Sequence, residues 1–570
     1  MEKRLFLMMG ISLLILVVSQ PFLSKYMKQP EPLKKPGQPN GVPTGTAPSV
    51  VPSILPASPA IGEVKTVAVQ ASAETETVVE NDLYRIAFSN RGAQVKSWIL
   101  KKYNNDSGKG NPLDLVHSVA APLYGYPLSL YTYNETRDKK LAQALYVSSA
   151  TGKLVPPATV TFEYADGETT VRKSFRFDDS YVVRIEASVM DKGAMVAALP
   201  AWPAGFGDQT IPSSYLNTQV AWDSPEKVSR LDQKKVAGGD TIHGPFRWAS
   251  VADPYFAAVF LPDDENSAAL VTLRNTIGIP KDPAKPDPND MEKEPVLGAA
   301  IGNLNGITRE RLFVGPKAMD VLAAVHSGPH ADERSLDNLV DYGFFHFVAR
   351  PLFLWLRWTH EHWVANWGWS ILVLTLVINI VMLPLRISTM KSSMKMMKLQ
   401  PQIAAITEKY KKYKLTDPRM ADKNKEVAEL YKQGGANPVG GCLPTILQLP
   451  FMYAFYTMLQ TAIELRQADF LWIKDLSSAD PLHLIPLLFV SSMFFMQKLT
   501  PQGGMDPAQQ KMMTFMMPLF MGFICWRLAA GLGIYWMAGN ILGIVQQLAM
   551  NRTQFGREMR AHMESRGRKK

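Results

Sequence analysis

Residues 367–385 read WGWSILVLTLVINIVMLPL, an apolar run long enough to cross a bilayer as one helix. Four more apolar runs follow, and we expect spans at 442–461, 482–497, 512–527 and 530–550. A hydrogen-bonding side chain lies at a similar depth in four of the five runs, namely Asn379, Gln448, Ser492 and the pair Gln546/Gln547. Polar groups are costly in hydrocarbon and tend to face a cavity or a bundle interior, so this shared layer predicts a working site.

The charges that flank these spans predict their orientation. Lys and Arg outnumber Asp and Glu by 12 to 5 in segment 386–441 and by 7 to 2 in the tail 551–570, whereas loop 462–481 holds 2 basic and 4 acidic residues. Segments rich in Lys and Arg stay in the cytoplasm. Together with an N-terminal span, this predicts six spans with both chain ends inside. The same rule explains the net charge of +10 more simply than nucleic-acid binding does.

The first 77 residues predict an anchor and a spacer. Leu5 to Leu23 is apolar and follows Lys3 and Arg4, which favours a transmembrane anchor over residues 1–27 with its N-terminus in the cytoplasm. A cleaved signal peptide is the alternative, but no small-x-small cleavage site follows the run. Residues 28–77 are rich in proline and predict an extended linker.

Residues 78–330 have the pattern of an all-β domain outside the cytoplasm. Between Tyr181 and Val189 apolar residues alternate with polar ones, the period of a half-buried strand. Asp166-Gly167 and the segment 89–92 each predict a turn between two strands. Many short strands favour a β-sandwich. The domain shows no phosphate loop, acid pair or nucleophile elbow, so its sequence predicts a fold without a chemistry.

Residues 331–364 are rich in aromatic side chains with interspersed arginines, which predicts an amphipathic helix lying in the membrane interface. His360-Glu361-His362 could suggest a metal site, but alternate residues diverge on a helix, and an exposed interfacial cluster is the favoured interpretation. The two cysteines, Cys442 and Cys525, fall near opposite membrane faces on this topology, which argues against a disulfide.

The polar layer predicts a recess that opens to the cytoplasm. Helix rise places Asn379 roughly 10 Å above Arg386, with Gln448 and Ser492 at a similar depth and Thr375 one turn further in. Single polar residues also bridge packed membrane helices, which is the alternative for each of them. Of 28 methionines, 20 follow residue 340. Flexible thioethers suit a surface that accepts many apolar sequences, although ordinary lipid-facing packing remains open.

Segment 386–441 predicts two polar helices that form a cytoplasmic hairpin, with a break at Asp417-Pro418 and an end at Gly434-Gly435. The hairpin is either a solvated topology signal or a docking surface for nascent chains or ribosomal RNA. The basic tail 551–570 could likewise attract phosphate without sequence preference, or act only as a cytoplasmic retention signal.

Several motifs in consistent order resemble the YidC-type membrane protein insertases. They are the segments 399–401 (LQP), 437–444 (NPVGGCLP), 448–451 (QLPF), 464–468 (ELRQA), 475–477 (DLS), 513–516 (MTFM) and 531–540 (GLGIYWMAGN). The match is dense over 340–555. The resemblance implies a multi-domain membrane protein with a five-helix α-helical insertase core over 365–550, an N-terminal anchor helix and a periplasmic β-supersandwich in the inner membrane of a Gram-negative bacterium.

The resemblance also implies a function. Such insertases receive polar segments of incoming membrane proteins in a hydrophilic groove and release apolar segments between the third and fifth spans. It implies no enzymatic activity and no cofactor or metal. Nascent membrane proteins, the ribosome, Sec translocon components and the lipid bilayer are the expected partners of a monomer. The groove residues expected here are Thr375, Asn379, Arg386, Gln448, Ser492, Thr514, Met516, Tyr535 and Gln546.

One departure from the family concerns charge. The family's groove carries an arginine where this chain has Asn379, five residues before Pro384. Arg386 lies nearly on the same helical face and could reach towards the groove mouth, whereas Arg527 is expected at the outer interface. Rival functions are a solute transporter or channel, and an anchored carbohydrate-binding or enzymatic β-domain. The first predicts inverted repeats, and the second leaves five spans unexplained.

Overall fold

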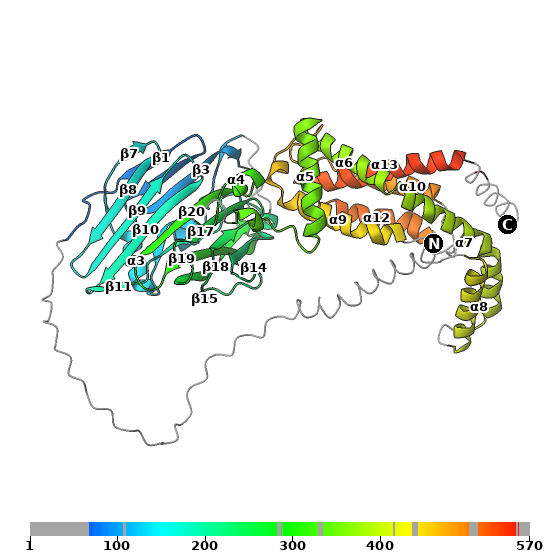
Figure 1. Ribbon diagram of the computed structural model, residues 1–570, viewed down its shortest axis with the longest axis horizontal. Coiled ribbons are helices and arrows are strands. Elements are labelled where there is room, and N and C mark those ends of the chain that lie inside the picture. Colours follow the sequence, from blue (N-terminus) through cyan, green and yellow to red (C-terminus); the bar gives the residue numbers. More distant parts are fainter. Residues whose placement is uncertain are drawn as a thin grey trace, which may run out of the picture. The chain divides into compact units, whose positions relative to one another are not determined.

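The computed structural model describes residues 68–105, 110–281, 287, 289–328, 334–413, 417–435, 443–500, 511–553 and 557 (Figure 1). The expected anchor 1–27, most of the linker 28–77, Cys442 and most of the tail 551–570 lie outside these residues. The side chains of residues 443–448, Gln448 among them, lie outside them as well.

Strands occupy the chain from Glu76 to Pro316 and, within the described residues, form three sheets. The ten-stranded sheet has the order β14 (Val228–Asp232), β13 (Gln219–Asp223), β16 (Trp248–Ala252), β17 (Phe256–Pro262), β20 (Thr308–Pro316), β10 (Val182–Asp191), β9 (Thr169–Phe177), β8 (Ala158–Ala165) and β6 (Val147–Ser148), with β11 (Ala194–Val196) paired to β10. One five-stranded sheet has the order β4 (Pro112–Asp114), β3 (Gln94–Asn104), β2 (Tyr84–Ser89), β1 (Glu76–Glu80) and β7 (Gly152–Leu154). The other has the order β15 (Thr241–His243), β18 (Ala268–Pro280), β19 (Met291–Asn303), β12 (Leu199–Trp202) and β5 (Ser129–Tyr131).

The three sheets share one apolar core, which confirms the predicted β-sandwich. Trp98 of β3, Phe175 of β9 and Val296 of β19 belong to the same buried cluster. The strand that the sequence predicted at 181–189 is β10, and its residues 183, 185, 187 and 189 are buried as the alternation requires. Both predicted turns are also present, since β8 pairs with β9 across Asp166-Gly167 and β2 pairs with β3 across 90–93.

Helices make up most of the chain after residue 345. They are α5 (His346–His362), α6 (Trp367–Val381), α7 (Leu383–Tyr410), α8 (Arg419–Gln433), α9 (Leu443–Thr461), α10 (Leu484–Leu499), the π-helical turn η5 (Met512–Met516), α12 (Met517–Cys525) and α13 (Ala530–Arg552). Shorter helical segments are α2 (Ala121–Tyr124), α3 (Glu135–Gln143), η1 (Pro212–Tyr215), α4 (Met319–Ala323), η2 (Leu336–Leu339) and η4 (Ile463–Leu465). Each of the five apolar runs expected between residues 367 and 550 therefore contains a helix.

Length and hydropathy single out one pair of helices among the described residues. No single helix there is both long and apolar enough to cross a membrane, but α6 together with residues 386–410 passes as a pair bent by 51°. The bend has a local cause. Pro384 at the start of α7 lacks a backbone N–H and so cannot continue the hydrogen-bond ladder of α6.

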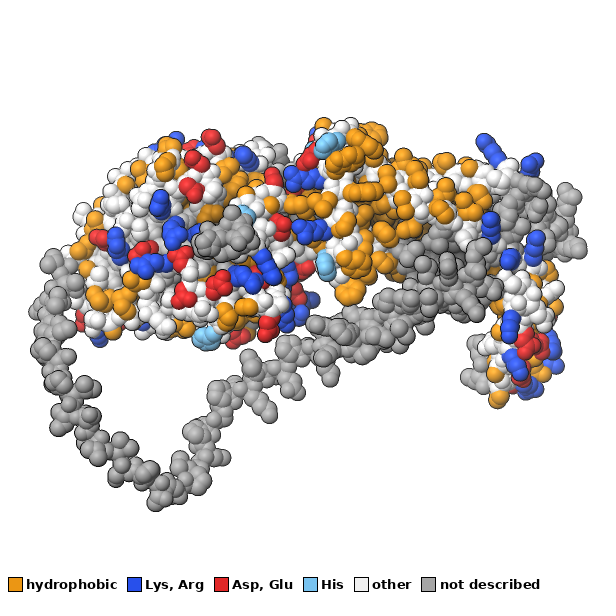
Figure 2. Space-filling view, viewed as in Figure 1, with side chains coloured by type: hydrophobic (Ala, Val, Ile, Leu, Met, Phe, Trp, Pro, Cys, Tyr) orange, Lys and Arg blue, Asp and Glu red, His pale blue; other side chains and the backbone are white. Residues whose placement is uncertain are grey.

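The amphipathic helix expected within 331–364 is α5, and it begins at His346. The residues before it belong to the sandwich, because Leu336 and Leu339 are buried in the β core. Leu352 and Leu356 of α5 face the helical region, whereas its outer face exposes aromatic side chains, Phe347, Trp355 and Trp358 among them. Hydrophobic side chains gather over the helical region, and charges are more frequent over the strands (Figure 2).

The two polar helices expected in segment 386–441 are the distal part of α7 and α8. They pack as a hairpin, in which Lys409 pairs with Glu426 at 2.7 Å and the Tyr410 hydroxyl donates to the same carboxylate at 2.8 Å. No described side chain of α8 is buried. On α7, by contrast, Met396, Met397 and Tyr410 are buried.

Candidate functional site

A cavity of about 450 Å³ lies among α6, the start of α7, α9, α10, α12 and α13. Among the described residues its polar lining comes from three elements, with Asn379 on α6, Arg386 on α7, and Tyr535, Trp536 and Asn540 on α13. The remaining lining is apolar and comprises Ile378, Met382, Leu449, Phe451, Met452, Phe489, Met493, Met496, Met517, Met521 and Gly539. The described helices thus enclose a recess that mixes a few hydrogen-bonding groups with flexible apolar side chains.

Asn379 is buried, and its side-chain amide donates to the Thr375 carbonyl of the preceding helical turn at 2.8 Å. Because that carbonyl can only accept, the NH₂ group must face it, which directs Oδ1 away from the helix backbone. Thr375 itself is fully buried and donates to the Ile371 carbonyl at 2.6 Å. It does not line the cavity. Of this predicted pair, Asn379 alone reaches the recess.

Arg386 reaches the recess from the first turn of α7. Its Nη1 donates to Oε1 of Gln546 on α13 at 2.8 Å. Gly543 permits this approach, since a Cβ there would lie 3.2 Å from Arg386 Nη1 and 2.8 Å from the Met496 methyl. Two predicted groove residues are therefore in direct contact. Gln547, its neighbour in the predicted layer, is buried and bonds instead to Asn551 at 3.0 Å.

The α13 wall is fixed by aromatic stacking and one polar bridge. Tyr535 stacks on Phe455 of α9, with ring centroids 4.2 Å apart, and Trp536 packs on Phe489 of α10 at 5.3 Å. Asn540 donates to the Ser492 hydroxyl at 3.2 Å, which joins α13 to α10. Ser492 is buried and acts here as a bridge between packed helices, the alternative that the sequence had left open.

Two further predicted residues stand outside the cavity wall. Thr514 and Met516 fall in η5, and Met516 is 61% exposed on the protein surface. The fold instead brings in residues that the polar pattern missed, chiefly Asn540 and the methionines of α10 and α12. A signal for them existed, because Met493/Met496 and Met517/Met521 have the spacing of one helical face.

Six of the lining residues are methionines: Met382, Met452, Met493, Met496, Met517 and Met521. Unbranched thioether side chains adapt their shape at low energetic cost and pack against varied apolar partners. Six of the methionines that are enriched after residue 340 therefore line the recess, whereas Met512 and Met516 are exposed on the surface outside it.

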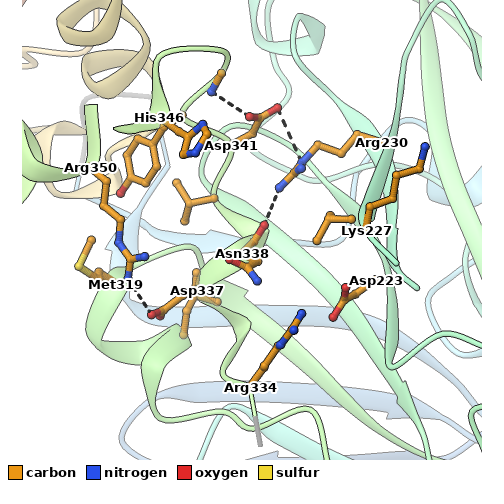
Figure 3. Close-up of a pocket in the computed structure, with 15 residues that line it drawn as sticks. Asp223, Lys227, Arg230, Met319, Arg334, Asp337, Asn338, Asp341, His346 and Arg350 are labelled. Carbon is orange, nitrogen blue, oxygen red and sulfur yellow. Dashed lines mark hydrogen bonds and ion pairs between the residues drawn. The ribbon is translucent and has the colours of Figure 1, made fainter. Parts of the chain in front are cut away.

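A second cavity, of about 420 Å³, lies between the β14 edge, segment 334–343 and the start of α5 (Figure 3). Arg350 pairs with Asp337 at 3.3 Å, and Arg230 pairs with Asp341 at 3.7 Å while donating to the Asn338 carbonyl at 2.5 Å. This cluster was not predictable from the sequence, because Arg230 on β14 and its partner Asp341 lie far apart along the chain. Its main effect is to connect α5 to the sandwich through polar contacts.

The His360-Glu361-His362 motif does not form a metal site. His360 stacks on Trp367 with ring centroids 3.9 Å apart, His362 stacks on Trp358, and Glu361 pairs with Arg357 at 2.6 Å. Within the described residues no group of three or more His, Cys, Asp or Glu side chains could hold a metal. Cys525 is a buried free thiol.

Comparison with known proteins connects these features to one family. Residues 358–557 match the family model of the 60Kd inner membrane protein, and residues 76–355 match that of the YidC periplasmic domain. A membrane protein insertase YidC of Geobacter sulfurreducens is 31% identical over 493 residues, covering 82% of this chain and 85% of that protein.

Solved structures give looser overlaps. An active YidC insertase with its first transmembrane domain resolved is 18% identical and has a TM-score of 0.34, with 85% of this chain and 95% of that one covered. YidC from Thermotoga maritima is 12% identical and has a TM-score of 0.27, with 84% and 98% covered. On the sequence matches, this chain belongs to the YidC family of inner-membrane protein insertases with a periplasmic domain, which are not enzymes.

Proposed function

We propose that this chain inserts membrane proteins by receiving their polar segments in the cavity between α6 and α13, and that this cavity opens to the cytoplasm. The observation that carries the proposal is the convergence of Asn379, Arg386 and Asn540 on one recess whose other walls are mostly methionine and aromatic. Hydrogen-bond partners inside the membrane lower the free energy of a polar segment on its way across, because an unpaired polar group in hydrocarbon is costly.

The driving force comes from the substrate. Its apolar segments gain free energy when they leave the protein for lipid, and the membrane potential acts on its charges. The exposed apolar faces of α10 and α12, which carry Leu487, Phe495 and Phe523, are suitable exit surfaces. In this proposal both chain ends are cytoplasmic and the sandwich is periplasmic, the orientation that the positive-inside rule predicts.

Because Asn379 stands where the family has a groove arginine, Arg386 takes the role of attracting negative charge. That guanidinium lines the same cavity, and its hydrogen-bond partner among the described residues, Gln546, is neutral. It can therefore attract an acidic residue of the substrate, while Asn379 supplies hydrogen bonds only. The α7–α8 hairpin would dock the ribosome, and the chain would act alone or beside the Sec translocon.

Reconstitution tests the core of the proposal. The purified full chain in liposomes should insert a two-span membrane protein with a short acidic polar loop, scored by protease protection of that loop. Empty liposomes and liposomes with a polytopic membrane protein of unrelated function are the controls. Insertion no better than in these controls would refute the proposal, and rapid flux of small solutes would favour the transporter alternative instead.

A further inference from the structure

Two hydrogen-bonding atoms in the cavity wall have no partner among the described residues. They are Oδ1 of Asn379 on α6 and Nε1 of Trp536 on α13, and both atoms are buried. Both residues line the same recess. Buried polar atoms are nearly always paired, so each unpaired one calls for a ligand or a water molecule.

The two atoms have complementary roles. The bond from the Asn379 amide to the Thr375 carbonyl fixes the orientation of the amide, so that Oδ1 presents an acceptor. The Trp536 indole nitrogen can only donate. Its ring is held against Phe489, with centroids 5.3 Å apart. The lining of the recess therefore holds one unpaired acceptor on α6 and one unpaired donor on α13.

Two other polar residues of the wall each make one hydrogen bond to a neighbouring helix. Arg386 donates to Gln546 and Asn540 donates to Ser492. Around them the lining is mostly methionine and aromatic, with little to discriminate one side chain from another. The two buried atoms of the wall without a partner among the described residues are thus one N–H donor and one C=O acceptor, the two kinds of group that a peptide bond can pair with.

We propose that Asn379 and Trp536 bind the backbone of the incoming chain, Oδ1 accepting from a peptide N–H and Nε1 donating to a peptide C=O. This inference rests on the proposed function and specifies its substrate class: a polar segment that is not yet helical. A helix satisfies its own backbone groups, whereas an extended segment presents them. Recognition through the backbone does not depend on sequence, as an insertase of many substrates requires.

Backbone recognition can be separated from side-chain recognition by a substrate with one amide replaced by an ester. The ester removes a single N–H and leaves every side chain in place. We expect a scan of esters through the polar loop of a synthetic two-span substrate to locate a short window where insertion by the reconstituted full chain falls about fivefold, the effect of one lost hydrogen bond. Esters outside that window should have little effect.

Protein variants then assign the window to the two residues. Asn379→Leu and Trp536→Phe should each lower insertion of the all-amide substrate by a similar factor, and in Asn379→Leu the window ester should cause no further loss. Trp536→Phe keeps the ring and removes only the donor, so it remains informative if Asn379→Leu folds poorly. Met512→Leu changes an exposed side chain outside the recess without changing its polarity and should insert normally.

Two outcomes would overturn the inference. One is that esters are tolerated throughout the loop. The other is that the window ester reduces insertion by the same factor in Asn379→Leu as in the unaltered protein, which would mean that a bound water satisfies Oδ1. Either result leaves the proposed function standing as long as the unaltered protein inserts the substrate. Failure of the unaltered protein itself counts against the proposed function instead.

Discussion

At the scale of single residues, Arg386 offers the most direct test, because it is the positively charged residue among the described residues of the cavity wall. Arg386→Gln should lower insertion of substrates with acidic polar loops about tenfold, since a charge-assisted hydrogen bond contributes roughly 1.5–3 kcal/mol. Arg386→Lys should retain most of the activity. The same assay with a loop of equal length but neutral sequence is the control. An equal loss on both substrates would mean that Arg386 holds α13 through Gln546 rather than attracting charge.

A second residue-scale prediction concerns His117 in the sandwich. Its Nδ1 accepts from the backbone N–H groups of Val119 and Ala120, both at 3.2 Å, and Nε2 lies 2.6 Å from the Tyr215 hydroxyl. That hydroxyl donates onward to the Gln209 carbonyl. The network therefore requires a neutral imidazole with its proton on Nε2, and burial lowers the pKa of His117 to about 4.

The folded pKa lies below the ordinary histidine value of 6.5, so between about pH 6.5 and 4 the unfolded chain binds more protons than the native one. The contribution of His117 to stability is present above pH 6.5 and is lost as pH falls through this window, by at most about 3 kcal/mol. We expect the urea midpoint of the sandwich transition, followed by tryptophan fluorescence, to drop on acidification. His117→Gln should flatten that slope, and an unchanged slope would contradict the assignment.

How much of the site was predictable depends on how local each interaction is. The Asn379 and Arg386 positions follow from spacing on one helical face, and both line the cavity. Ser492 was also recognisable as a buried polar residue, but its partner Asn540 lies 48 positions away. His117 and Tyr215 are 98 positions apart. Pairings of this kind depend on tertiary packing, which periodicity does not encode.

At the scale of elements, the α7–α8 hairpin gives the clearest prediction. Lys391, Lys395 and Lys398 are exposed and share one face of α7, since they are spaced by four and three residues. Reversing all three to Glu should weaken co-sedimentation with ribosomes by tenfold or more at low salt, because phosphate contacts dominate such binding. The difference should shrink as salt is raised.

The matched control changes net charge equally on the sandwich, at the exposed Lys227, Lys234 and Lys235. That variant should bind ribosomes like the unaltered protein. Equal loss in both variants would indicate a general charge effect, and no loss in either would leave the hairpin as a topology signal.

Element prediction worked best where a short period or a strong breaker dominates. The alternation in 181–189 gave β10, Asp166-Gly167 gave the β8–β9 turn, and the break near Asp417-Pro418 precedes α8 at Arg419. The sheet order was not predictable, because β20 sits between β17 and β10, far from both in sequence. The π-helical turn η5 was not predictable either, because it does not alter the spacing of the apolar residues in the sequence.

At the scale of the whole molecule, the sandwich contacts the helical region chiefly through polar groups. Arg466 donates to the Asn104 carbonyl at 3.0 Å, and Gln467 donates to the Asn104 and Asn105 carbonyls, each at 3.1 Å. The Arg350–Asp337 pair adds another such contact. Exposed polar contacts of this kind contribute about 0–1 kcal/mol each. The two apolar clusters meet at few points: Ile463 of η4 is buried in the sandwich core, and Met319 and Val340 pack against the core of the helical region.

Removing residues 80–320 should therefore leave the helical core folded, because the lost contacts are mostly weak polar ones. The truncation uncovers Ile463, which is 3% exposed in the full chain, so this residue is also changed to Ser. Insertion by the truncated chain should then stay within about twofold of the full chain. The measurement is protease protection of a two-span substrate in proteoliposomes, at matched amounts of reconstituted protein. The cavity residues all follow residue 377, so none is removed. A complete loss of insertion, with the truncated chain still monodisperse and helical, would mean that the sandwich takes part in the reaction and would revive a binding role for it.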